Sequence, residues 1–183
     1  MNASLVSRAN SLVLGALLGL PLLGLLPALA AAQAGTGTAA PAFRLQDQHD
    51  AWISLADQKD KWLVVYFYPM DETPGCTTEA CEFRDNIFAF RKLGVQLLGI
   101  SVQDVASKKQ FASKHSLPFS VLADGDKSVA KAYGVLSILG YARRETFVID
   151  PQGRIARHYP SVDPQQHSRQ LLIDLQALIK PAP

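Results

Sequence analysis

The fold of this chain is constrained most by an alternation of short apolar runs and amphipathic segments after residue 61. The apolar runs are rich in β-branched and aromatic residues, which is typical of buried strands. They are Leu63–Phe67, Val95–Val102 and Phe119–Leu122. The segments between them place apolar residues three or four positions apart, which predicts helices. These helices are expected over residues 76–93, 105–115 and 128–133, ended by Gly94, by Leu117-Pro118 and by Gly134.

The C-terminal part of the sequence predicts a hairpin and a final helix. Thr146–Ile149 and Arg154–Tyr159 are expected strands around a turn that contains proline and glycine. Residues 164–180 have the apolar spacing of an amphipathic helix. This order of elements predicts an α/β protein with a mixed central sheet flanked by helices on both sides. It is the order of a thioredoxin-like fold with an additional segment in front.

The first 34 residues differ in composition from the rest of the chain. They carry one charge, Arg8, followed by a stretch rich in leucine, glycine and alanine. This pattern is typical of a secretory signal peptide, with Ala28-Leu-Ala30 as one of several small-residue cleavage sites. An uncleaved membrane anchor is the alternative, since about 20 apolar residues can span a bilayer. Either interpretation predicts an exported domain, periplasmic or lumenal, which an uncleaved leader would anchor to the membrane.

Length, composition and charge predict the domain organisation and argue against some classes of function. Residues 35–40 are small and uncharged and are expected to be a flexible linker, and residues 41–183 are expected to form one domain. The 18 basic and 16 acidic residues are interspersed, which argues against a nucleic-acid partner. The sequence has no glycine-rich nucleotide loop, so we expect no nucleotide cofactor. Four histidines are scattered along the chain and predict no metal site: His49, His115, His158 and His167.

Both cysteines lie in one short segment after the first apolar run. Cys76 is expected at the start of a helix, where unpaired backbone N–H groups favour a thiolate over a thiol. Cys81 follows five residues later. A structural disulfide is the plain alternative for two cysteines in an exported chain. In a continuous helix, however, Cα atoms five residues apart are about 8.6 Å apart, and a disulfide needs about 4.4–6.8 Å. A bond between these cysteines would therefore unwind the turn that joins them.

Residues 68–85 resemble the active-site segment of the peroxiredoxins. The family pattern has proline, then threonine four residues later, then cysteine three residues after that, and Pro69, Thr73 and Cys76 match it. A second cysteine five positions further, Cys81, is typical of the Q-type branch, also called the bacterioferritin comigratory protein group. Similar segments at residues 117–124, 129–134 and 144–150 extend the resemblance from Pro41 to the C-terminus. The resemblance implies a thiol peroxidase with a thioredoxin-like fold.

The resemblance assigns successive roles to the two cysteines. Cys76 would attack hydrogen peroxide or an organic hydroperoxide and become a sulfenic acid. Cys81 would resolve it by forming an intramolecular disulfide, for which a monomer suffices. A thioredoxin-like protein, exported like this chain, would reduce the disulfide. The reaction requires no cofactor, and its implied role is protection against oxidative stress.

Four further residues receive roles from the same resemblance. Arg144 would favour the Cys76 thiolate and polarise the peroxide, with Glu79 orienting the guanidinium. Thr73 would bind the peroxide through its hydroxyl, and Pro69 would shield the pocket from water. Each position also has a plainer interpretation: Thr73 as a helix N-cap, Glu79 as a favourable charge near a helix start, and Arg144 as a surface residue. Arg143 is the rival arginine, and strand alternation would direct the two side chains to opposite faces.

Two other function classes fit a thioredoxin-like fold. A disulfide carrier or isomerase normally has two cysteines separated by two residues, a spacing that this chain lacks. A non-catalytic binding protein with an incidental disulfide is the other class. Oxidation of Cys76 by peroxide would distinguish a peroxidase from both.

Overall fold

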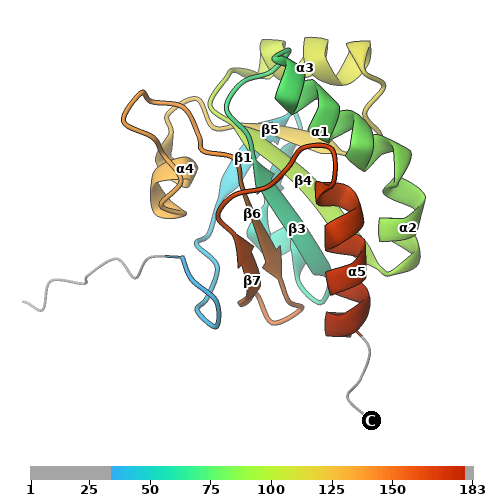
Figure 1. Ribbon diagram of the computed structural model, residues 1–183. Coiled ribbons are helices and arrows are strands. Elements are labelled where there is room, and N and C mark those ends of the chain that lie inside the picture. Colours follow the sequence, from blue (N-terminus) through green and yellow to red (C-terminus); the bar gives the residue numbers. More distant parts are fainter. Residues whose placement is uncertain (1–33, 180–183) are drawn as a thin grey trace, which may run out of the picture. The chain divides into compact units, whose positions relative to one another are not determined.

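The computed structural model describes residues 34–179, and a seven-stranded sheet lies at their centre (Figure 1). The strands are β1 (Arg44–Asp47), β2 (Trp52–Ser54), β3 (Trp62–Phe67), β4 (Val95–Ser101), β5 (Ser120–Ala123), β6 (Glu145–Ile149) and β7 (Ile155–Tyr159). Their spatial order is β2-β1-β5-β4-β3-β6-β7. The expected signal peptide or anchor lies outside the described residues, apart from Ala34. Within residues 34–179, every helix is too short or too polar to span a bilayer.

The sheet is mixed, as the order of elements predicted. β3 pairs in parallel with β4, and β4 pairs in parallel with β5. β6 runs antiparallel to β3, and β7 runs antiparallel to β6. At the other edge, β1 and β2 form an antiparallel hairpin that joins the sheet through β5, and this hairpin is the additional front segment. Because β3, β4 and β5 are parallel, the loops that follow them lie at the same edge of the sheet.

Helices cover both faces of the sheet. They are α1 (Pro74–Asp85), α2 (Ile87–Lys92), α3 (Val105–Lys114), α4 (Ser128–Ala132) and α5 (His167–Ile179), with a short 3-10 helix η1 (Leu55–Gln58). Side chains of α1, α2, α3 and α5 share one buried cluster with Val64 and Tyr66 of β3. Residues of α4 share the other cluster with Val65 and Phe67. The alternation of side chains along β3 therefore supplies both cores, and the expected fold class is confirmed.

The single helix expected over residues 76–93 begins two residues earlier, at Pro74, and is divided at Asn86. Asn86 ends α1 with φ −101° and ψ 5°, and α2 begins at the next residue. Its side-chain amide donates to the carbonyl oxygen of Glu82 (2.9 Å) and to Oγ of Ser168 (3.1 Å). The bond to Ser168 joins residues 82 positions apart, so local spacing did not predict the break. Gly94 follows α2 with φ +72°, in agreement with its expected position at the helix end.

Two other expectations differ from the structure: the start of the last helix and the flexibility of residues 35–40. α5 begins at His167 rather than at residue 164, because residues 164–166 form a turn in which Asp163 accepts hydrogen bonds from the backbone N–H groups of residues 165 and 166. Residues 35–40 were expected to be a flexible linker but are hydrogen-bonded to β7 and its turn. The N–H of Gly37 donates to the Ile155 carbonyl oxygen at 2.7 Å, and that of Ala40 to Gly153 at 2.9 Å. These backbone bonds do not depend on side chains, so the composition gave no sign of them.

Candidate active site

Cys76 lies at the start of α1, which follows β3, an interior strand of the sheet. β3 ends at Phe67, and residues 69–73, here called the entry loop, lead to Pro74, the first residue of the helix. Proline suits this position because the first helical N–H has no partner in the helix and the φ of proline is helical. Cys76 is the third residue of α1 and is 1% exposed. Unpaired N–H groups of the first helical turn surround this position and favour a negative charge on sulfur.

The guanidinium of Arg144 contacts both Cys76 and Glu79. Its Nη2 donates to Sγ of Cys76 at 3.2 Å, and its Nη1 donates to Oε2 of Glu79. Arg144 precedes β6, whose first residue, Glu145, is paired with Phe67 at the end of β3. The antiparallel pairing of these strands thus brings residue 144 beside the start of α1. A fixed cation is in direct contact with the sulfur.

Arg143 points away from the sulfur. Its Nε donates to Oε1 of Glu145, and its Nη2 donates to the carbonyl oxygen of Gly134, both at 2.6 Å. Half of its side chain is exposed, whereas the side chain of Arg144 is mostly covered. The two arginines therefore diverge, as strand alternation predicted, although both lie just before the strand itself.

Glu79 is a buried carboxyl group one helical turn after Cys76. It is 1% exposed, and its Oε1 has no hydrogen-bond partner. Burial raises the pKa of Glu79 to about 7, because removal from water opposes ionisation more than the nearby Arg144 favours it. For Arg144, burial opposes the charge, but Glu79 and Cys76 outweigh it and raise its pKa above the ordinary value. The arginine is therefore permanently charged, whereas the carboxyl group titrates near neutral pH.

Three residues of the entry loop and the helix start surround this group. Thr73 occupies the N-cap position, but its side chain makes no capping bond and instead donates to the Met70 carbonyl oxygen at 2.9 Å. The proton of that hydroxyl is thereby engaged, and its oxygen is available as an acceptor. A Cβ on Gly75 would lie 3.2 Å from Nη2 of Arg144, so the missing side chain makes room for the guanidinium. Pro69 is half-buried at the beginning of the loop.

Cys81 lies in the middle of the same helix. Both cysteines are reduced, Cys76 being buried and Cys81 half-buried. α1 is continuous from Pro74 to Asp85, so the helical spacing expected between the sulfur-bearing residues is present. The neighbouring residues Ala80 and Phe83 are fully buried and hold this part of the helix in the core. A disulfide within α1 would require this helix to open.

His167 lies beside this group, although its sequence position gave no indication of it. It is 3% exposed, and its Nε2 lies 2.8 Å from Oγ1 of Thr146, two residues after Arg144. Its ring packs edge-on against Phe83 and Tyr159. Burial lowers the pKa of His167 to about 4, and the positive charge of Arg144 adds to this effect. The imidazole is thus neutral at neutral pH and leaves Arg144 as the cation nearest to the sulfur.

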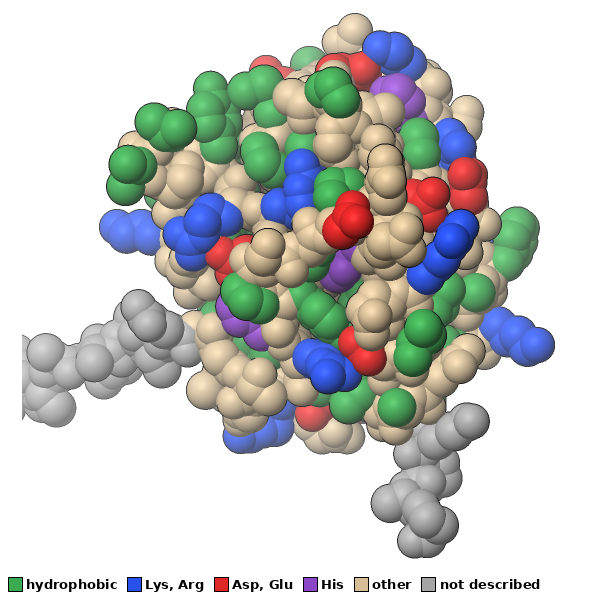
Figure 2. Space-filling view, viewed as in Figure 1, with side chains coloured by type: hydrophobic (Ala, Val, Ile, Leu, Met, Phe, Trp, Pro, Cys, Tyr) green, Lys and Arg blue, Asp and Glu red, His purple; other side chains and the backbone are tan. Residues whose placement is uncertain are grey.

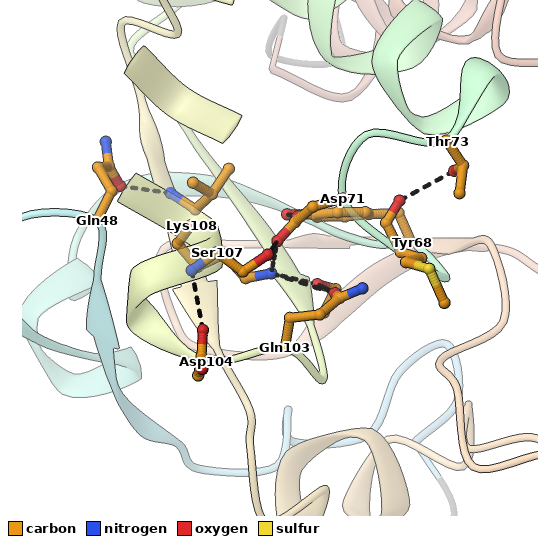
Figure 3. A network of polar contacts seen from close by, with 11 residues as sticks. Gln48, Tyr68, Asp71, Thr73, Gln103, Asp104, Ser107 and Lys108 are labelled. Atoms are coloured by element: carbon orange, nitrogen blue, oxygen red, sulfur yellow. Dashed lines mark hydrogen bonds and ion pairs between the residues drawn. The ribbon is translucent and has the colours of Figure 1, made fainter. Parts of the chain in front are cut away.

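A second buried charged group supports the entry loop. Asp71 of the loop and Lys108 of α3 form an ion pair at 2.8 Å, with side-chain exposures of 3% and 0% (Figure 3). Sequence reasoning missed it, although a signal was present. Lys108 lies three residues before Phe111, on the apolar stripe of its helix, where a lysine is unusual. A charged residue on a buried stripe indicates a buried partner.

The face of the molecule drawn in Figure 2 is mixed in charge, with basic side chains interspersed with acidic ones. A cleft of about 580 Å³ lies at the opposite end of β3, lined by Leu63 and by the turn between β6 and β7, and it contains no cysteine. Within residues 34–179, no three His, Cys, Asp or Glu side chains gather as metal ligands would. The group around Cys76 is therefore the candidate active site.

Comparisons with known proteins show the family to which this chain belongs. Residues 36–158 match the model of the AhpC/TSA family. Peroxiredoxin Q of Oryza sativa subsp. japonica, described as chloroplastic, is 43% identical over 145 residues, which are 78% of this chain and 67% of that protein. The chloroplastic peroxiredoxin Q of Populus jackii is 42% identical over 150 residues, 80% of this chain and 70% of that protein.

Solved structures show the same relationship. The bacterioferritin comigratory protein of Xanthomonas campestris superposes with a TM-score of 0.72 at 31% identity, over 75% of this chain and 92% of that one. Peroxidoxin BcpB of Mycobacterium tuberculosis superposes with a TM-score of 0.75 at 32% identity, over 80% of this chain and 99% of that one. The chain therefore belongs to the AhpC/TSA family, in its peroxiredoxin Q branch, and is a peroxidase with a thioredoxin-like fold.

Proposed function

We propose that this protein reduces hydrogen peroxide and organic hydroperoxides through a sulfenic acid on Cys76. The observation that carries the proposal is the contact of 3.2 Å between Nη2 of Arg144 and Sγ of Cys76 at a helix start. Both the guanidinium and the helix N–H groups favour the thiolate, which is the nucleophile. The thiolate attacks the terminal peroxide oxygen, the O–O bond breaks, and the leaving oxygen takes a proton to become water or an alcohol. A structure of the Xanthomonas campestris relative concerns alkyl peroxide reduction, which supports the organic substrates.

The other residues of the site act on the peroxide or on Arg144. Thr73 accepts a hydrogen bond from the peroxide O–H, because its own proton is held by the Met70 carbonyl oxygen. Arg144 stabilises the charge that develops on the leaving oxygen. Glu79 orients the guanidinium through the bond to Nη1. Pro69, at the start of the entry loop, keeps water from the thiolate.

Cys81 completes the cycle within the same chain. Its thiolate attacks Sγ of the sulfenic acid, the S–O bond breaks, the leaving hydroxide takes a proton to become water, and a Cys76–Cys81 disulfide forms. Because α1 separates the two sulfurs, the turn between them must open before this step. No second subunit is needed, and we propose that the protein works as a monomer. A thioredoxin-like protein then reduces the exposed disulfide and restores both thiols.

Two cysteine variants test this assignment. Cys76→Ser should abolish peroxide consumption, whereas Cys81→Ser should react once with peroxide and accumulate sulfenic or sulfinic acid, detected by mass. Hydrogen exchange should rise within residues 76–85 after oxidation of the wild-type protein, while β3 stays protected. Normal turnover by Cys76→Ser would refute the nucleophile. A disulfide found only between two chains on non-reducing gels would refute the intramolecular cycle.

We also propose that residues 1–34 are a removable targeting leader and that the mature domain works in a periplasmic or lumenal compartment. The support is the single charge before a long apolar stretch that ends in small residues. The plant relatives of this protein are described as chloroplastic, which also supports a targeting leader. The reductant must then be a thioredoxin-like protein of the same compartment. N-terminal sequencing of the mature protein tests this: an intact leader on a membrane-bound protein would indicate an anchor instead.

A further inference from the structure

The entry loop is fixed by a carboxylate that is almost fully bonded. Oδ1 of Asp71 accepts the hydroxyl of Tyr68 at 2.7 Å. Its Oδ2 accepts the hydroxyl of Ser107 at 2.6 Å and the ammonium of Lys108 at 2.8 Å. Figure 3 shows these partners converging on the loop, Tyr68 from the position after β3 and the other two from α3. Three donors therefore hold the residue that lies five positions before Cys76.

Lys108 joins this carboxylate to the end of β4. Its ammonium also donates to Oγ of Ser101, the last residue of β4, and approaches Oε1 of Gln103 at 3.5 Å. The side chain has no exposed surface. Removing either partner of such a pair strands an unpaired charge in the protein interior, which is strongly unfavourable. Separating the two charges inside the protein would be unfavourable for the same reason.

The part of α1 that follows the two cysteines is attached to the end of α3. Nη1 of Arg84, near the end of α1, donates to the carbonyl oxygen of His115 at 2.9 Å, directly after α3. An exposed ion pair, Glu72 with Lys114 at 2.5 Å, also joins the entry loop to α3 but is screened by water. α3 thus contacts the chain on both sides of the two cysteines.

We propose that Asp71 and Lys108 are positioning residues that keep the entry loop on α3 while α1 opens between the loop and Arg84. The loop carries Pro69 and Thr73, so the peroxide pocket stays in place on the N-terminal side of Cys76 throughout the cycle. The ion pair then has two effects: it holds the pocket for peroxide attack, and it confines the opening that disulfide formation requires. This inference rests on the roles proposed above for the two cysteines.

The wild-type protein tests the attachment directly, with the disulfide formed by diamide rather than by peroxide. Lysine-selective NMR should detect the Lys108 ammonium, protected from exchange with water, in the reduced and in the disulfide form. Hydrogen exchange should rise within residues 76–83 of the disulfide form, while α3 and the Tyr68 N–H, which bonds to Ile100, stay protected. Loss of the Lys108 signal on disulfide formation would overturn the proposal. Because diamide forms the bond, this result does not depend on whether Cys76 reacts with peroxide.

A pair of variants tests the effect on the reaction. Asp71→Asn/Lys108→Met removes both charges together and keeps side chains of similar size, and Lys114→Met removes only the exposed pair. In single-turnover measurements the double variant should react with peroxide about tenfold more slowly, because the loop is no longer fixed, yet form its disulfide faster than wild type. Lys114→Met should match wild type in both steps. Equal slowing of both steps, or no change in either, would overturn the proposal, and the wild-type experiment decides the matter if the double variant does not fold.

Discussion

Two buried side chains beside Arg144 should give the stability of this protein opposite dependences on pH. Burial raises the pKa of Glu79 to about 7 and lowers that of His167 to about 4. Both groups therefore prefer their neutral form in the folded state. The carboxyl group is neutral when it is protonated, and the imidazole is neutral when it is deprotonated. Their contributions to folding consequently have opposite signs over the same range of pH.

For Glu79, stability falls as the pH rises. The ordinary pKa of 4.5 applies to the unfolded chain, and the folded value is about 7, so between these limits the folded state binds more protons. Each tenfold change in proton affinity is worth about 1.4 kcal/mol, and the whole change therefore costs about 3 kcal/mol of unfolding free energy above pH 7. The bond to Arg144 is already included in that value, since it acts against burial.

For His167, stability falls as the pH falls. The unfolded chain binds a proton near pH 6.5, whereas the folded imidazole resists it down to about pH 4. The same conversion gives a loss of about 3 kcal/mol at the acidic end. In the wild-type protein the two effects offset each other almost completely between these limits. Replacement of either residue should therefore reveal the pH dependence of stability that the other residue causes.

The test compares Glu79→Gln and His167→Gln with the wild-type protein by urea unfolding in a reducing buffer, at about pH 4.5 and about pH 8. Glu79→Gln should resemble wild type at the acidic pH and exceed it by about 3 kcal/mol at the alkaline pH. His167→Gln should resemble wild type at the alkaline pH and exceed it by a similar amount at the acidic pH. Other titrating groups contribute equally to all three proteins and cancel in the differences. If both variants differed from wild type by the same amount at both pH values, the two groups would not be held neutral by burial and the reasoning would fail.

Three substitutions, and Arg143→Met as a control for the first, probe the geometry around the sulfur and the packing of the sheet. Arg144→Met should slow peroxide attack by about 100-fold, while Arg143→Met should leave the rate constant unchanged; the reverse pattern would assign the role to Arg143. Gly75→Ala should slow the same reaction by about tenfold without loss of stability, since its Cβ would lie 3.2 Å from the guanidinium, and an unchanged rate constant would show that Arg144 has room to move. Gly99→Ala should destabilise the protein by about 1–3 kcal/mol in urea, because its Cβ would lie 2.6 Å from the ring of Tyr66, and wild-type stability would contradict this close packing.

The sequence was informative wherever local pattern decides structure. β3 and β4 begin and end within a residue of their predicted limits, because a buried strand must be apolar along its length. The β1–β2 hairpin was not predicted in detail, since its strands have four and three residues and are only partly buried. The break at Asn86 depends on Ser168, and residues 35–40 depend on backbone bonds to β7. Contacts between distant segments leave no periodic signal.

Some residues of the candidate site could likewise be predicted from the sequence, and others could not. Cys76 and Cys81 are distinctive by type and spacing, and a family pattern pointed to Thr73 and Arg144. His167 and Lys108 were not identified, because a lone histidine or lysine in a helix is usually a surface residue. What reveals them is burial beside another charge, which only the folded chain shows.

The buried charge of Glu79 also bears on how α1 opens. In the cycle proposed above, opening the turn from Cys76 to Cys81 would move Glu79 toward water, and above pH 7 this would recover the cost of about 3 kcal/mol that its ionised form carries in the folded state. Exposing a side chain such as Phe83 costs about 2–3 kcal/mol, so the two terms are of similar size. We therefore expect disulfide formation to accelerate through pH 7 more steeply in the wild-type protein than in Glu79→Gln. Stopped-flow measurement of this step across pH, in both proteins, isolates the effect of the carboxyl group, because the two proteins differ only at residue 79. Identical pH profiles would mean that Glu79 stays buried as the helix opens.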